Sequence, residues 1–414
     1  MSIPTPEKRI LEFERLGFGM FIHYGLYSQL ARGEWVMNAS HIGAEEYSKL
    51  METFTAKQFD GRTIARIAKS TGMKYITLTA RHLDGFSLYD TRGLCNYDAP
   101  HSAAGRDLIQ DFVEGCNAEG ILPILYHTTL DWFQPIYQNN FKEYLEYLRK
   151  SIEILCTKYG KVGGFWFDGN WSRPASDWDE DGLYSTIRKY QPEALIINNT
   201  GMDARGRIGH PEIDCVTYEQ GKPMPMQREK MAKYVAAEMC QTLNEHWGFA
   251  ESDMNYKSIS EIIETLCVCR KVGANYLLNV GLGGEGDVVS IQRNFLDELG
   301  KWIKLCGNSI YQGKPSEICA ENKDFALEAD NIAFFYIHDL HTVGSSDVVT
   351  NGSDYGYRHF RNVKKRIKRI VWTDNNESLD FVQHGENVWF DANGYPYGCN
   401  YVVRVARIEF ENQQ

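Results

Sequence analysis

Short apolar runs alternate with longer amphipathic stretches over the first three quarters of the chain. The clearest amphipathic stretch covers about 140–158, where Phe141, Tyr144 and Leu148 recur at the spacing of one helix face. Similar helical patterns lie at 61–70, 107–118 and 183–190. The apolar runs between them predict buried strands at 17–23, 74–80, 122–127, 163–168, 194–199, 213–219, 238–242 and 276–280.

The order of these patterns predicts the fold class. Repeated βα units form a parallel sheet, and about eight of them close into a barrel. Beyond residue 314 the helical periodicity fades, and turn residues separate short strand patterns. We therefore expect an α/β fold, a (β/α)8-like TIM barrel over 1–314, followed by a C-terminal antiparallel β-sandwich over 315–414. The sandwich strands are predicted at 331–337, 367–373, 378–382, 387–390 and 401–411.

Composition and charge narrow the classes of partner. The 414 residues are 43% hydrophobic, which supplies a large core, and carry a net charge of −11. A nucleic-acid partner is not expected, because phosphate binding requires basic patches. The one basic run, 364–366, precedes a strand pattern and is predicted to be a solvated edge. Residues 1–7 lack an apolar signal core and no run suits a membrane span, so we expect a cytoplasmic protein.

The segment 163–169 carries the strongest indication of chemistry. Its apolar and aromatic residues predict a buried strand that ends in Asp168, and Gly169 follows at once. A buried carboxylate costs free energy unless it is paired. At the C-terminal end of a barrel strand an acid is catalytic more often than structural. Asp168 is therefore the first candidate for a reacting group.

The other strand ends predict what surrounds Asp168, because these ends converge on one mouth of a barrel. They are rich in carboxylates, histidines and tryptophans, which suit a sugar: its C–H face packs on an indole and its hydroxyls take directed hydrogen bonds. Two carboxylates flanking a glycosidic bond suit glycoside hydrolysis. The strand-end residues are His23, 81–84, His127, Asp131, Trp132, Trp166, Asn198, Asn199, Glu219 and Glu238.

Five motifs in order give a family resemblance. The segments 23–28, 33–35, 81–86, 126–132 and 165–169 together resemble the α-L-fucosidases of glycoside hydrolase family 29, as does the plan of a barrel followed by a β-sandwich. The resemblance implies a retaining exo-α-L-fucosidase that removes terminal α-L-fucosyl residues from oligosaccharides or glycoconjugates. It implies double displacement through a covalent fucosyl-enzyme, with water or another sugar hydroxyl as acceptor. It implies no metal ion and no organic cofactor.

The resemblance also assigns candidate roles to the carboxylates. Asp168 matches the position of the family's nucleophile. Glu219, within 217–221, looks like the family's Thr-x-Glu segment and is favoured as the general acid/base. Glu238 is the main alternative. The remaining candidates are Glu212, Asp214 and Glu245.

Several further residues match substrate-binding positions of the family. His127 is expected to face the sugar, and Trp247 either stacks on the sugar that carries fucose or packs in the barrel wall. The chain has Leu83 where the family commonly has a second histidine. Either His127, Asn198 or water is expected to satisfy that hydroxyl, or the substrate preference is changed at the same chemistry. The residues that match positions holding fucose hydroxyls or lining the fucose pocket are His23, Glu34, Trp35, His82 and Trp166.

Two other classes of function stay open. A metal-dependent barrel hydrolase would use His23, His82, His127 and Asp168 as ligands, but the first strand lacks the second histidine of a His-x-His pair. A non-catalytic fucoside-binding protein would not need Asp168 together with a later glutamate. The β domain is expected either to brace the barrel or to carry an interface between copies of the chain.

Overall fold

The computed structural model describes residues 3–340, 342–345, 348–353, 356–396 and 398–411. The chain forms two compact units. The first comprises Met1–Lys257 and Asn275–Leu296, and the second comprises Ser258–Ala274 and Asp297–Gln414. A domain boundary at residue 314 stays a prediction. Within the described residues, no helix is both long and apolar enough to span a bilayer.

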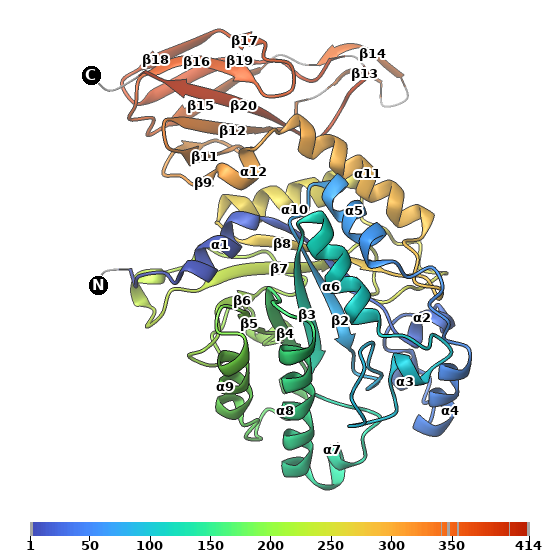
Figure 1. Ribbon diagram of the computed structural model, residues 1–414. Coiled ribbons are helices and arrows are strands. Elements are labelled where there is room, and N and C mark those ends of the chain that lie inside the picture. The colour runs from blue at the N-terminus through green and yellow to red at the C-terminus, as the bar shows by residue number, and fades with distance from the viewer. Residues whose placement is uncertain (1–2, 341, 346–347, 354–355, 397, 412–414) are drawn as a thin grey trace. The chain divides into compact units, whose positions relative to one another are not determined.

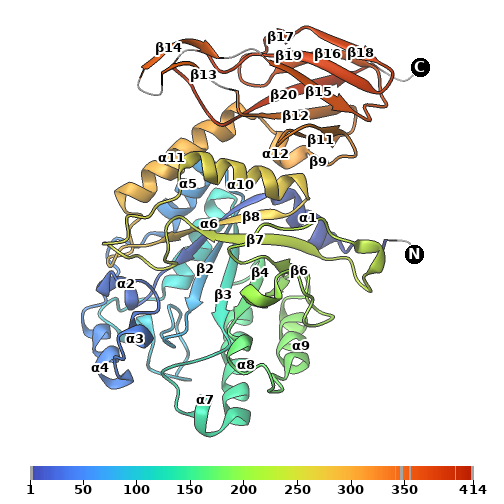
Figure 2. The same ribbon diagram turned by 180° about the vertical axis from the view of Figure 1, so that it is seen from behind.

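Eight parallel strands form the centre of the first unit and close into a barrel (Figure 1). Strand β1 pairs with both β2 and β8, which closes the ring, and Figure 2 shows β7 and β8 side by side. The predicted barrel is therefore confirmed. Its strands are β1 (Phe18–His23), β2 (Tyr75–Arg81), β3 (Leu122–Thr128), β4 (Gly164–Asp168), β5 (Leu195–Asn198), β6 (Cys215–Thr217), β7 (Ala236–Thr242) and β8 (Asn275–Gly281).

Three long helices of the first unit, α5 (Gly61–Thr71), α6 (Leu108–Glu119) and α8 (Phe141–Lys158), begin at a side-chain N-terminal cap. The side chain of Asp60 accepts a hydrogen bond from the Thr63 amide, and Asp107 caps the next long helix in the same way. The other helices are α1 (Lys8–Leu16), α2 (Tyr27–Leu30), α3 (Val36–Ala39), α4 (Ala44–Ser48), α7 (Ile136–Asn139) and α9 (Glu180–Tyr190).

Two connections of the barrel contain no α-helix in the described chain. Residues 199–214, between β5 and β6, hold only the short 3-10 turn Met202–Ala204. Residues 218–235, between β6 and β7, hold only the 3-10 turn Arg228–Lys230. Both connections are interrupted by glycine and proline, which disfavour helical continuation. The barrel is (β/α)8-like rather than a complete alternation.

The second unit contains a sandwich of two antiparallel sheets, as predicted. One sheet has the order β10-β15-β19-β18 and the other β17-β16-β20-β12-β11-β9, with β13 and β14 forming a separate hairpin. Phe335, Phe360 and Phe390 stack between the two sheets and are buried in their core. The predicted strands do not include β9, β10, β11, β13, β14 or β15.

The bounds of the second unit's elements complete the description. Helix α11 (Ser290–Leu305) crosses the division between the units at residue 296. The other elements are α10 (Ile259–Lys271), α12 (Ser309–Gln312), β9 (Lys314–Pro315), β10 (Cys319–Ala320), β11 (Phe325–Ala329), β12 (Ile332–His338), β13 (Thr342–Ser345), β14 (Val348–Ser353), β15 (Gly356–Arg361), β16 (Ile367–Trp372), β17 (Ser378–Leu379), β18 (Phe381–His384), β19 (Asn387–Ala392) and β20 (Val403–Phe410).

Candidate active site

A cavity of about 690 Å³ lies at the C-terminal ends of the barrel strands. Successive side chains of a strand point to opposite faces, so only alternate residues near each strand end reach it. The loops after the strands complete its wall. Its lining includes Phe21, His23, Glu34, Trp35, His82, Leu83, Tyr126, Trp166, Asp168, Trp171, Asn199, Glu219, Cys240, Glu245 and Trp247.

Asp168 is held at the end of β4 by three hydrogen-bond donors. Trp171 Nε1 and Asn199 Nδ2 donate to its Oδ1 at 2.9 and 3.2 Å, and the Tyr126 hydroxyl donates to its Oδ2 at 3.1 Å. Burial raises the pKa of Asp168, and the three donors oppose that rise by favouring the ionised form. The site therefore presents a carboxylate whose orientation is fixed.

Gly169 makes the turn that follows Asp168 possible. Its φ of 122° lies in the region that side chains rarely adopt. A Cβ at this position would also lie 2.8 Å from both the Leu130 amide nitrogen and Thr129 Oγ1. Glycine therefore lets the chain turn sharply and bring Trp171 back over the carboxylate of Asp168.

Glu219 lies just beyond β6 and faces the same cavity. Asn199 Nδ2 donates to its Oε2 at 2.7 Å. Burial, together with the negative charge of Asp168, raises the pKa of Glu219 to about 7. A proton on Glu219 is therefore retained up to about neutral pH, whereas an ordinary glutamate would be ionised.

The amide of Asn199 bridges the two carboxylates, and its orientation is fixed. Gly201 N–H donates to Asn199 Oδ1 at 3.3 Å, and the Thr217 hydroxyl lies 2.9 Å from the same oxygen. Because an N–H can only donate, the atom facing Gly201 must be the oxygen. The NH₂ group of Asn199 therefore faces Asp168 and Glu219 and gives one hydrogen to each.

Two neutral imidazoles form another part of the wall. His23 Nδ1 lies 2.7 Å from Asn279 Oδ1, and Asn279 Nδ2 donates to the Trp247 carbonyl, so His23 donates from Nδ1. Burial lowers the pKa of His23 to about 3. The pKa of His82 is also far below its usual range, because of burial and of His23, whose ring centroid lies 5.2 Å away. Both histidines therefore act as hydrogen-bond partners without charge.

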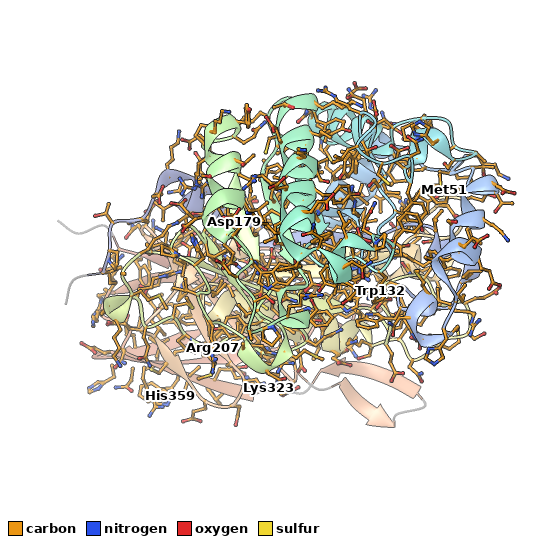
Figure 3. All side chains as sticks on the ribbon, turned by 90° about the horizontal axis from the view of Figure 1, so that it is seen from below. Met51, Trp132, Asp179, Arg207, Lys323 and His359 are labelled. Atoms are coloured by element: carbon orange, nitrogen blue, oxygen red, sulfur yellow. The ribbon has the colours of Figure 1, made fainter. Side chains whose placement is uncertain are left out.

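Aromatic rings complete the inner wall and the rim. Trp247 is half-buried and packs on Phe21 and His23, with ring centroids 5.7 and 5.3 Å apart, while it also lines the cavity. At the rim, Trp35 lies between Trp171, at 6.1 Å, and Trp132, which is labelled in Figure 3, at 5.1 Å. The cavity thus offers both aromatic faces and polar groups, the combination that suits a sugar ring.

Glu238, the alternative acid/base, is placed away from the cavity. Its side chain is fully buried and accepts hydrogen bonds from the Tyr75 hydroxyl at 2.6 Å and from Trp166 Nε1 at 3.0 Å. Burial raises the pKa of Glu238 to about 7, so a raised pKa alone does not distinguish it from Glu219. Their positions do distinguish the two glutamates. Glu238 hydrogen-bonds to Trp166 on the side away from the cavity, and Glu219 faces the open volume of the cavity.

The three remaining acidic candidates separate in the same way. Glu212 pairs with Arg188 at 2.8 Å and is absent from the cavity lining among the described residues. Asp214 is buried, which raises its pKa, but ion pairs with Arg9, Arg188 and Lys233 outweigh burial and lower it. Glu245 does line the cavity, at an exposed position of the rim.

His127 does not face the cavity, and that expectation is wrong. Its Nδ1 donates to the Thr128 carbonyl at 2.7 Å, and its Nε2 lies 3.2 Å from the Tyr89 hydroxyl. Tyr126 reaches the cavity from the same strand, so strand alternation sends His127 to the outer face. Among the described residues, no group of three or more His, Cys, Asp or Glu is placed to hold a metal ion.

Asn198 also points away from the cavity. Its Nδ2 donates to the Tyr184 hydroxyl at 2.8 Å and to Glu180 Oε1 at 3.2 Å. Neither His127 nor Asn198 therefore compensates for Leu83, which lines the cavity as a purely apolar surface. The next residue, Asn199, takes the inward position that strand alternation assigns to it.

Two important contacts had no sequence-based prediction. Trp171 follows Asp168 by three residues. The sequence feature that could have indicated its contact with Asp168 is a tryptophan shortly after the glycine at the strand end. Asn199 was recognised as a strand-end residue, but its bridging of two carboxylates depends on the spacing of β4, β5 and β6. The Asn199 contacts join residues from different βα units, which a single-sequence pattern does not resolve.

Comparison with known proteins places the chain in a family. The α-L-fucosidase family model matches residues 7–308. The tissue α-L-fucosidase of Rattus norvegicus is 28% identical over 363 residues, covering 80% of this chain and 76% of the rat protein.

Solved structures agree with this placement. α-L-Fucosidase isoenzyme 1 from Paenibacillus thiaminolyticus has a TM-score of 0.83 and 28% identity, with 98% of this chain and 99% of that chain covered. A trapped covalent intermediate of an α-L-fucosidase from Bacteroides thetaiotaomicron has the same fold, with a TM-score of 0.79, 20% identity, and 100% and 98% coverage. The chain belongs to the α-L-fucosidase family of glycoside hydrolases.

Proposed function

We propose that this protein is a retaining exo-α-L-fucosidase that removes terminal α-L-fucosyl units from oligosaccharides or glycoconjugates. The observation that carries the proposal is the pair of carboxylates bridged by Asn199. The two oxygens that Asn199 bridges, Asp168 Oδ1 and Glu219 Oε2, can lie no more than about 6 Å apart, which is below the roughly 6.5–9.5 Å carboxyl separation of inverting glycosidases and leaves room for the roughly 5–5.5 Å of retaining ones.

The hydrogen bonds of Asp168 indicate which of its oxygens attacks. Oδ1 accepts two hydrogen bonds, from Trp171 and Asn199, whereas Oδ2 accepts one, from Tyr126. Oδ2 therefore keeps a lone pair for the anomeric carbon. In the first step Oδ2 forms a bond to that carbon, the bond from the carbon to the glycosidic oxygen breaks, and a fucosyl ester results.

Glu219 supplies and then removes the proton. Asn199 donates to Oε2, so the acidic proton of Glu219 resides on Oε1 and passes to the departing oxygen in the first step. In the second step the ionised Glu219 takes a proton from water, whose oxygen attacks the anomeric carbon and displaces Asp168. A sugar hydroxyl in place of that water gives transfucosylation. The trapped intermediate of the Bacteroides thetaiotaomicron enzyme supports a covalent path on this fold.

The stereochemistry of the first product tests the proposal directly. An aryl α-L-fucoside should be hydrolysed, and NMR at early times should show α-L-fucose before mutarotation produces the β-anomer. Initial release of β-L-fucose would contradict the double displacement. Absence of hydrolysis would contradict the activity itself.

Replacing Asn199 with alanine should shift the pH profile of kcat/KM toward alkaline pH. Asp168 must be ionised and Glu219 protonated, so these groups set the acid and alkaline limbs. The Asn199 hydrogen bonds lower the pKa of both groups, and their loss therefore raises both. We also expect activity at the optimum to fall about 10- to 100-fold, through lost orientation.

The measurement is kcat/KM for an aryl fucoside across the pH range. An alanine at Asn117, an exposed asparagine of α6, is the matched control and should leave the profile unchanged. A drop in activity with both limbs in their original places would show that Asn199 does not set the ionisation of the pair.

A further inference from the structure

A second hollow, of about 330 Å³, lies beside the active-site cavity. Trp171, Asn199 and Thr200 line both spaces, so the two are neighbours within the first unit. The rest of the hollow is formed by the segment after β4, which runs to Asp179 (labelled in Figure 3), and by the helix-free connection after β5. Asn198 and Asn199 are the strand-end residues predicted from the sequence that line this hollow.

The hollow lies on the side from which the leaving group departs. Glu219 must give its proton to the glycosidic oxygen, so the sugar attached to fucose lies near Glu219. Asn199 touches Glu219 at 2.7 Å and lines the hollow as well. Trp171, which is 40% exposed, connects the two spaces along the rim. The part of an oligosaccharide that extends beyond Glu219 would therefore lie next to the hollow.

Two asparagines give the hollow unused acceptors. Asn170 and Asn198 both line it, and both direct Nδ2 to the same oxygen, Oε1 of Glu180. Their Oδ1 atoms are buried and accept no hydrogen bond from any residue that the structure describes. Buried polar atoms are seldom left without a partner, because this costs free energy. Hydroxyl groups are donors that match them.

The remaining lining also suits a neutral sugar. Trp171 and Trp178 contribute indole surface, on which the C–H face of a pyranose packs, and Ser176 adds a hydroxyl. Glu180 is the charged side chain of the lining, so an anionic group such as a sialic acid, sulfate or phosphate would meet repulsion. Indoles, amide oxygens and one carboxylate together favour an uncharged, hydroxyl-rich ring.

We propose that this hollow is a subsite for a neutral pyranose of the leaving oligosaccharide, one unit beyond the sugar that carries fucose. The inference rests on the proposed fucosidase activity and extends it to the substrate class. The enzyme then binds fucosylated trisaccharides and longer glycans with an additional contact in this hollow. Fucosylated disaccharides are too short to make this contact.

Three fucosides of increasing length test the subsite: an aryl fucoside, a fucosylated disaccharide, and the same disaccharide extended by one neutral sugar. For the unmodified enzyme we expect kcat/KM for the trisaccharide to exceed that for the disaccharide about tenfold, the size of one good ring contact. Equal values for the two would overturn the proposal without any mutant. Failure to hydrolyse the aryl fucoside would instead contradict the fucosidase activity, so the two failures are distinguishable.

Filling the hollow provides the second arm of the test. Ser176→Trp and, on the opposite connection, Ala204→Trp each place an indole in the hollow from a partly exposed position. Each should abolish the trisaccharide advantage and leave the aryl fucoside rate within about twofold. Ala175→Trp, at an exposed neighbouring residue that is not part of the lining, is the matched control and should keep the advantage. A trisaccharide advantage that survives both filling variants would overturn the proposal.

Discussion

Replacing Asp168 with alanine is expected to lower hydrolysis of an aryl fucoside by at least about 10⁴-fold, the scale seen when a group central to covalent catalysis is removed. The physical reason is that Asp168 is the carboxylate that shares the Asn199 amide with Glu219, and alanine supplies no nucleophile in its place. The three donors now on Asp168 would instead face the space that the carboxylate occupied.

Azide should restore turnover of this variant. A small anion fits where the carboxylate was, is met by the N–H groups of Trp171 and Asn199, and attacks the anomeric carbon from the same face. The product should be β-L-fucosyl azide, formed with inversion, which NMR distinguishes from fucose. Thermal unfolding should confirm that the variant is folded, and an unimpaired Asp168→Ala enzyme would end the assignment of Asp168 as nucleophile.

Replacing Glu219 with alanine should affect substrates according to their leaving group. A sugar alcohol leaves poorly without a proton, so kcat/KM for a fucosylated oligosaccharide should fall about 10²- to 10⁴-fold. An activated aryl leaving group needs little proton transfer, so its formation of the fucosyl-enzyme should fall far less. Burst kinetics with the aryl fucoside would then show that the ester accumulates, because water lacks its base.

The pH dependence of activity provides an independent test of the role of Glu219. Glu219 must be protonated in the first step, and its pKa is about 7, so activity should decline as pH rises through that value. The Glu219→Ala variant should lose this alkaline limb for the aryl substrate. A limb that persists unchanged would show that another group is the acid.

Glu238→Gln is the matched comparison, because Glu238 has a raised pKa of the same size and lies in the neighbouring strand. Its expected effect is a moderate loss through Trp166, the same for good and poor leaving groups. If Glu238→Gln shows the leaving-group dependence and Glu219→Ala does not, then the assignment of the acid/base is reversed.

The sequence predicted strand ends well and side-chain directions less well. Apolar runs located all eight barrel strands, and Asp168 was identified because a carboxylate at the end of such a run is rarely structural. Glu219 lies just beyond the C-terminal end of β6, whereas Glu238 is the third residue of β7, near the N-terminal end of that strand. The prediction that Glu238 stands at the C-terminal end of a strand is therefore wrong: Glu219 faces the cavity, and Glu238 is buried in the barrel interior. That difference depends on where each residue lies relative to the strand's last hydrogen-bonded pair, which no periodicity in the chain reports.

His127 and Asn199 show that the sequence did not predict on which face of the barrel a strand-end side chain lies. His127 stands in a motif with an inward-facing tyrosine, and strand alternation turns it outward. Asn199 follows Asn198, which faces outward, and strand alternation therefore directs the Asn199 side chain toward the cavity. The contacts of Trp171 were beyond prediction for a different reason, since they depend on the positive φ of Gly169, which fixes where the loop returns.

The two helix-free connections on either side of β6, the second of which carries Glu219, have a consequence for how this enzyme diversifies. Loops that carry no part of a packed helical layer accept insertions and deletions with little loss of stability. Asp168, the proposed nucleophile, lies between connections that do include a helix, α8 before it and α9 after it. We therefore expect insertions and deletions in these two connections to alter the range of glycans accepted with less loss of stability than changes around β4, the strand that carries Asp168.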